Sequence, residues 1–196
     1  MQGIIYIAGS FYTVNKSKCG KGKGWIDNDP HFWINPPTWG ICRNDLRKKV
    51  KDKDYIFYVL PKKSPHKQCL FGYIKVKEII THEQAYRHPK LKAKRMRNKN
   101  PNGNIIVDSN GIYNKFDGNA HIAIFNKIKD QYVIGDTCNS RMLSEEEINR
   151  LAPSFVDLLK ELFNKQEGTS PIDFISRYGK ILCEKQVNKL LEWVNK

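Results

Sequence analysis

The chain has 196 residues, of which 40% are hydrophobic and 11% aromatic, so it holds enough apolar material for a packed core and is not expected to be disordered throughout. No stretch approaches the roughly 18 uninterrupted apolar residues that a membrane span needs, and the first residues, MQGIIYIAGSFYTVNK, lack the basic start of a signal peptide. The formal net charge of +14 is large, and a positive field of this size favours a polyanionic partner.

The charge is unevenly distributed along the chain. Residues 1–143 hold 26 Lys and Arg against 11 Asp and Glu, whereas residues 144–196 hold 8 against 9. Solubility alone does not explain this segregation. It indicates that the first part of the chain binds nucleic acid, because neutralised phosphates release their counterions.

The five cysteines are far apart and include no Cys-x-x-Cys pair. We therefore expect no zinc site and no disulfide framework, and a reducing, cytoplasmic location. No cofactor is expected either.

The first 143 residues are predicted to form mostly strands and turns. Residues 4–14 are β-branched and aromatic, and 55–61 form a continuous apolar run typical of a buried strand. Between them, 44–54 resemble a short helix capped by Asn44. Residues 70–82 alternate in their second half, as an exposed antiparallel strand does.

The next segments are predicted from turn signals. Residues 82–104 are basic and flanked by proline, which indicates a short helix and a loop. Residues 104–116 are expected to be two strands around a Ser-Asn-Gly turn, and 120–136 a hairpin that turns at Lys129-Asp130.

The character of the chain changes at Ser144. Ser144 and Glu147 form a capping-box pattern that opens a helix, which Pro153 should kink or split after Leu151. Ser170-Pro171 opens a further helical stretch, which Gly179 interrupts. Strands first and helices last predict an α+β protein: a small, mostly antiparallel barrel with flanking helices over 1–143, and a C-terminal helical appendage over 144–196.

Three groups of residues predict a nucleic-acid site. A cationic run between Pro89 and Pro101 is typical of a phosphate-binding arm, although such a run is also typical of a solvated loop. Together with basic residues of 43–53, the expected phosphate contacts are Arg43, Arg47, Lys48, Lys92, Lys94, Arg95 and Arg97.

Large aromatic rings in loops rich in proline and glycine form the second group, because such rings are less easily explained as core and can stack on a nucleobase. Packing onto the end of the barrel is the alternative for each ring. The expected stacking residues are Phe11, Tyr12, Trp33 and Trp39.

Polar residues at a strand end form the third group. Asp108, Ser109 and Asn110, with Tyr113 shortly after, carry the side chains that would read the edge of an extruded base. An Asx turn is the alternative explanation for the same residues.

No catalytic motif stands out. His121 near Asp117 could form a general acid–base pair, so a nuclease or glycosylase using Asp117, His121 or Asp136 stays open. A basic protein-interaction module is a third alternative, in which the C-terminal helices form a homodimer through Leu158, Leu159, Leu162, Phe163, Leu190, Leu191 and Trp193. A catalytic role and a bound metal are not expected.

The order of four segments resembles the PUA-like superfamily, which includes the EVE, ASCH, YTH and SRA branches. These are Gly40 to Arg47, Asp52 to Tyr55, Gly72 to Glu78 and Asp108 to Tyr113, and they are most similar to the nucleotide-modification-associated domains of bacteria and phages. The chain departs from that pattern where Asp52 and Lys53 replace a glycine and where Gly111 is inserted. The helical tail has no counterpart in it.

The resemblance implies a small barrel with a pocket for one base, often a modified one. It also implies a link to DNA modification or its sensing, so DNA is favoured over RNA as the partner. We therefore expect a nucleic-acid reader.

Overall fold

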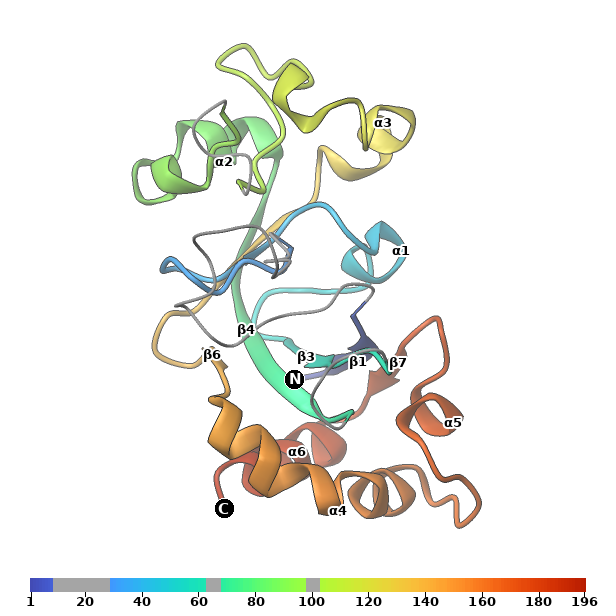
Figure 1. Ribbon diagram of the computed structural model, residues 1–196. Helices are drawn as coiled ribbons and strands as arrows, with labels where there is room; N and C mark the ends of the chain where they lie inside the picture. The colour runs from blue at the N-terminus through green and yellow to red at the C-terminus, as the bar shows by residue number, and fades with distance from the viewer. Residues whose placement is uncertain (9–28, 63–67, 98–102) are drawn as a thin grey trace. The chain divides into compact units, whose positions relative to one another are not determined.

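The computed structural model describes residues 1–8, 29–62, 68–97 and 103–196 (Figure 1). The described strands form a mixed, mostly antiparallel seven-stranded sheet in the order β2-β5-β4-β3-β1-β7, with β6 paired to β4. This confirms the α+β class, but these strands do not close into a barrel. The chain divides into two compact units: unit 1 is Met1–Ile26, Lys53–Tyr73 and Met142–Lys196, and unit 2 is Asp27–Asp52 and Ile74–Arg141.

The strands of unit 1 come from distant parts of the chain. Strand β1 (Gly3–Ile7) pairs in parallel with β3 (Tyr55–Val59) and antiparallel with β7 (Lys180–Leu182). Every residue of β3 is buried, as its continuous apolar run predicted. A strand buried on both faces reads as unbroken hydrophobic sequence rather than as an alternating one.

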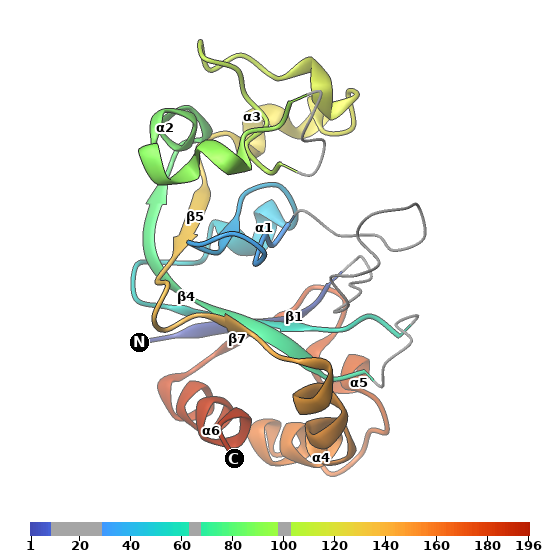
Figure 2. The ribbon, with the colours of Figure 1, turned by 60° about the vertical axis from the view of Figure 1, so that its left-hand side comes forward.

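Three helices complete unit 1: α4 (Glu145–Phe163), α5 (Pro171–Ile175) and α6 (Glu184–Val194). The predicted capping box is confirmed, since the Ser144 hydroxyl accepts from the Glu147 amide at 3.1 Å and the Glu147 carboxylate accepts from the Ser144 amide at 2.8 Å. Pro153 does not split α4. Figures 1 and 2 show α4 and α6 side by side beneath the strands of this unit.

The segment from Ser144, expected to be an appendage, therefore shares a unit with β1 and β3. Of the seven apolar residues expected to form a dimer face, five are buried within the chain: Leu158, Leu159, Leu162, Leu190 and Trp193. The lack of a side chain at Gly3 allows α6 to pack closely on β1, because a Cβ at this position would lie 2.7 Å from Cγ2 of Val187. These side chains form the core of unit 1 rather than an open interface.

Unit 2 is built on short strands. Strand β5 (Tyr132–Gly135) pairs antiparallel with β2 (Thr38–Trp39) and with the second half of β4 (Leu70–Ile80), where the register shifts between Val76 and Glu78. The short strand β6 (Arg141–Met142) has one residue in each unit of the chain.

The helices of unit 2 are short: α1 (Asn44–Arg47), α2 (His82–Arg87) and α3 (Phe125–Ile128), with the 3₁₀ helices η2 (Pro89–Lys94), η3 (Lys115–Asp117) and η4 (Ile122–Ile124). Two apolar clusters support them, one around Leu91, Ile105 and Tyr132 and the other around Ile41, Met96 and Ile128. Within the described residues, no helix has both the length and the apolar character that a membrane crossing requires.

Three local predictions for unit 2 are corrected. Residues 120–136 are not a hairpin, because their first half forms η4 and α3. Residues 104–116 form two isolated bridges instead of two strands: an antiparallel one between Val107 and Tyr113, and a parallel one between Ile105 and Arg95. The residue that caps α1 is Arg43, in the left-handed region at φ 52°, and not Asn44.

Candidate functional site

A buried polar network fixes the centre of unit 2. The Asp29 carboxylate accepts hydrogen bonds from the backbone amides of Gly40 (2.6 Å), Ile41 (2.8 Å) and Cys42, and from the side-chain amide of Asn104 (3.2 Å). Burial raises the pKa of Asp29, although the Arg47 charge and the backbone amides oppose this. A buried carboxylate with several donors is typical of a structural anchor.

Three residues predicted to contact nucleic acid lie inside this core, which corrects their assignment. Trp39, Arg47 and Lys94 each have 0% of their surface exposed. The Arg47 guanidinium donates to the backbone oxygens of Gln131 (2.8 Å) and Ile41 (3.2 Å) and lies 5.9 Å from the centre of the Trp39 ring. A ligand at the surface cannot reach any of the three.

Lys94 is held by His31. Its Nζ donates to the His31 backbone oxygen at 3.1 Å and lies 3.1 Å from His31 Nδ1. Burial lowers the pKa of Lys94 to about 7, and the nearby Asp29 charge opposes this shift. Burial, together with Lys94, also lowers the pKa of His31 to about 3. The cationic run thus contributes one side chain to the core.

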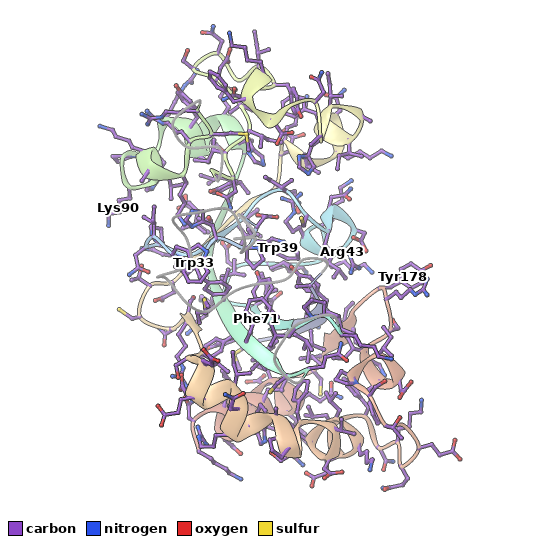
Figure 3. The ribbon with its side chains drawn as sticks, viewed as in Figure 1. Trp33, Trp39, Arg43, Phe71, Lys90 and Tyr178 are labelled. Carbon is purple, nitrogen blue, oxygen red and sulfur yellow. The ribbon has the colours of Figure 1, made fainter. Side chains whose placement is uncertain are left out.

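The remaining predicted cations differ in how strongly they are held. Arg43 is paired with Asp45 at 2.8 Å. Arg95 is partly buried, donates from Nε to the Tyr86 backbone oxygen at 2.8 Å and lies 4.2 Å from the centre of the Tyr86 ring. Lys48, Lys92 and Arg97 are exposed, as is Lys90, which extends away from the ribbon (Figure 3).

The residues expected to read a base edge form an Asx turn. Oδ1 of Asp108 accepts from the amides of Asn110 (2.8 Å) and Ile112 (3.0 Å), and Gly111 adopts the left-handed φ of 76° that the turn needs. Ser109 and Asn110 are exposed at its tip. The turn was the alternative explanation for these residues, and it also fixes the orientation of the Asp108 carboxylate.

A cavity of about 420 Å³ opens beside this turn. We call it the Asp108 cavity, and the described residues that line it are Tyr86, Met96, Arg97, Asp108, Tyr113, Asn114, Lys115 and Phe116. Cavities of a few hundred cubic ångströms are typical of small-ligand sites. All of its lining lies in unit 2.

Aromatic rings and cations share the wall of the Asp108 cavity. Phe116 is 44% exposed, and the Lys115 ammonium lies 5.6 Å from the centre of its ring. Tyr86 carries the Arg95 guanidinium against its ring, which holds that ring in place. An exposed aromatic ring beside a cation is the arrangement that stacks a base and binds its phosphate.

Tyr113 links the cavity to a second group of residues. Its hydroxyl donates to the Asp117 carboxylate, which also accepts from Nδ1 of His121 at 2.8 Å. Burial would raise the pKa of Asp117, but the hydrogen bonds from His121 and Tyr113 outweigh it and hold that pKa below its usual value. Burial and the bond to Asp117 raise the pKa of Tyr113 to about 12.

The structure brings together part of the predicted site. Asp108, Tyr113 and Arg97 line one cavity, whereas Ser109, Asn110 and the half-buried Trp33 are not among its lining residues. Phe11 and Tyr12 lie outside the described residues. Sequence reasoning missed Tyr86, Met96, Asn114, Lys115 and Phe116. Asn114, Lys115 and Phe116 follow Tyr113 directly in the sequence, and this was the one sequence feature that could have pointed to them.

Two other features of the described residues bear on function. A cavity of about 430 Å³ lies between α4 and α6 in unit 1, and it is lined by none of the predicted site residues. No group of three or more His, Cys, Asp or Glu side chains in the described part of the chain is arranged to hold a metal ion. Asp136 accepts from the amides of Cys138 (2.8 Å) and Asn139 (3.1 Å) in an Asx turn of its own.

Comparison with known proteins gives no relative: no family model, curated protein or solved structure matches the chain.

Proposed function

We propose that unit 2 is a nucleic-acid reader that holds one unpaired or flipped base, including a modified one, in the Asp108 cavity. The observation that carries this proposal is the wall of the cavity, where three aromatic rings and two cations surround about 420 Å³. Unit 2 also has 18 Lys and Arg against 10 Asp and Glu, so a polyanion is attracted to it.

The proposal assigns separate tasks to the lining residues. Tyr86, Tyr113 and Phe116 stack on the base, and each stacked base contributes roughly 1–3 kcal/mol. Arg97 and Lys115 bind the flanking phosphates, and the exposed Lys48, Lys90 and Lys92 strengthen the attraction. Stacking offsets the few kcal/mol that flipping a base out of a duplex costs.

We also propose a PUA-like architecture for the chain, which is a more specific assignment than the α+β class and the seven-stranded sheet. The order of the motifs between Gly40 and Tyr113 supports it. DNA is proposed as the partner in preference to RNA, because the PUA-like families that the chain resembles are linked to DNA modification.

Binding of short single-stranded DNA, measured by fluorescence anisotropy at two salt concentrations, tests the proposal. Phe116→Ala should weaken binding by about 5- to 150-fold, the equivalent of one lost stacking contact. Tyr178→Ala is the matched control, because Tyr178 is 77% exposed in unit 1. If both variants bind as tightly as the unmodified protein, the cavity is not where the base binds.

A second candidate is hydrolysis of a nucleic acid or nucleotide, favoured by the Asp117–His121 pair. Asp117 orients the imidazole through Nδ1, as the carboxylate does in a general-base pair, and 28% of the His121 side chain is exposed. Incubation of labelled DNA and RNA with the protein, with and without divalent cations, tests this activity. Cleavage that is lost in His121→Gln supports a hydrolase, and intact substrates favour the reader.

A further inference from the structure

Asp108 is the one carboxylate among the described residues that line the cavity, whose other side chains are aromatic, cationic, an amide and the thioether of Met96. Its Oδ1 is occupied by the amides of Asn110 and Ile112, so the side chain cannot rotate freely. Its Oδ2 accepts no hydrogen bond from any described residue. An ionised carboxylate can only accept hydrogen bonds, so Oδ2 is available to accept one from a donor group of a ligand.

The polar side chains next to Asp108 are already engaged. Asn114 donates to the Met96 backbone oxygen at 2.9 Å and accepts from the Phe116 amide at 3.0 Å. The Tyr113 hydroxyl is directed to Asp117, and Arg97 donates to the Lys92 backbone oxygen at 2.9 Å. The hydrogen-bonding preference of the cavity is therefore set largely by Asp108.

A fixed acceptor distinguishes bases by their edges. Cytosine and adenine present an exocyclic amino group, and guanine presents an amino group beside a ring N–H, so each offers a donor to a carboxylate. Uracil and thymine present carbonyl oxygens on both sides of a single N–H, and these oxygens are repelled by the carboxylate. A phosphate is repelled as well, which directs it to Arg97 and Lys115.

We propose that Asp108 makes the cavity select nucleobases that carry an exocyclic amino group over uracil and thymine. This inference rests on the proposed function, because it assumes that a base occupies the Asp108 cavity. A hydrogen bond to a charged group favours the matching base by about 10-fold or more.

Oligomers of deoxycytidine and deoxyuridine provide the test, because their bases differ only in the donors and acceptors along one edge. The unmodified protein should bind the deoxycytidine oligomer at least about 10-fold more tightly in an anisotropy titration. An oligomer in which both hydrogens of the cytosine amino group are replaced by methyl groups should lose that advantage.

Asp108→Asn is the decisive variant. The side-chain oxygen of asparagine can still accept from the Asn110 and Ile112 amides, so the turn is kept, while an amino donor replaces Oδ2. The preference for deoxycytidine should disappear or reverse toward deoxyuridine. Asp136→Asn is the matched control, since it makes the same charge change in a similar turn that does not line the cavity.

The outcomes separate the two proposals. A deoxycytidine preference that survives in Asp136→Asn and is lost in Asp108→Asn supports the inference, provided that thermal unfolding shows Asp108→Asn to be folded. Equal binding of the two oligomers, or a preference that Asp108→Asn leaves unchanged, overturns the inference and leaves the reader function standing. Failure of every oligomer to bind overturns the reader function, and the inference with it.

Discussion

His82 makes the stability of unit 2 dependent on pH. Its ring is fully buried, its Nε2 donates to the Gly40 backbone oxygen at 2.8 Å, and its Nδ1 accepts from the Ile106 amide at 3.4 Å. Burial lowers the pKa of His82 from 6.5 to about 3, and the Arg47 charge adds to this, while Gly40 and Asp117 oppose it. The folded protein therefore keeps this ring neutral at any pH well above 3.

The sign of the effect follows from proton binding. Between pH 6.5 and about 3 the unfolded chain protonates His82 and the folded chain does not, so the free energy of unfolding falls as the pH falls through this window. At pH 5 the unfolded ring is almost fully charged, and the loss amounts to about 2 kcal/mol relative to pH 7.5. The loss of unfolding free energy reaches its full size only when the pH falls to about 3, the pKa of His82 in the folded protein.

Urea unfolding of the unmodified protein and of His82→Gln, at pH 7.5 and pH 5, isolates this contribution. Glutamine keeps an amide donor for Gly40 but does not titrate, so the difference between the two pH values should shrink by about 2 kcal/mol in the variant. His88→Gln is the control, since His88 is only partly buried. An unchanged pH dependence in His82→Gln would show that the ring is not held neutral in the folded state.

Three further predictions concern residues that the structure relocates. Lys94→Met should leave the salt dependence of DNA binding unchanged because Lys94 is buried, whereas Arg97→Gln should lower the slope of log affinity against log salt by about 0.7 in anisotropy titrations; equal slopes would contradict this. Trp39→Ala should lower the free energy of unfolding by about 3–5 kcal/mol in a urea titration, because it leaves a cavity in the core; a variant of normal stability would contradict its burial. A chain ending after Leu143 loses β7 and the three helices of unit 1, so it should bind a hydrophobic dye that the full chain does not, and a dye-silent fragment would contradict the packing described for β1 and β3.

Local sequence signals predicted the elements that depend on neighbouring residues. The capping box at Ser144, the proline at the start of α5 and the buried run of β3 are all confirmed. Each of these patterns specifies its element through contacts within a few residues, so no knowledge of the tertiary fold is needed.

The failures come from long-range contacts. Trp39 lies in a loop rich in proline, yet the two residues of β2 pair with Ile134 and Val133 and draw its ring into the core. Residues 120–128 were expected to form the first strand of a hairpin because they are rich in isoleucine, but they form the short helices η4 and α3.

The Asp108 cavity shows the same limit. Tyr86 comes from α2, and the residues after Tyr113 come from η3 and the turn before it. The sequence points to Asp108 and Tyr113 because polar side chains at a predicted strand end suit the edge of a base. The contact between α2 and residues 108–116 depends on the path of the chain after β4, and no local sequence pattern predicts that path.

The pairing of β1 with β7 has a consequence for how the protein is made. Gly3 lies opposite Leu182, so the sheet of unit 1 cannot be completed until Leu182 has left the ribosome. The last residue of unit 2, Arg141, leaves the ribosome before Leu182 does. Unit 2 can therefore fold before β7 is available to pair with β1. During that interval β1 and β3 expose apolar surface, and nascent chains are most vulnerable to aggregation at this stage.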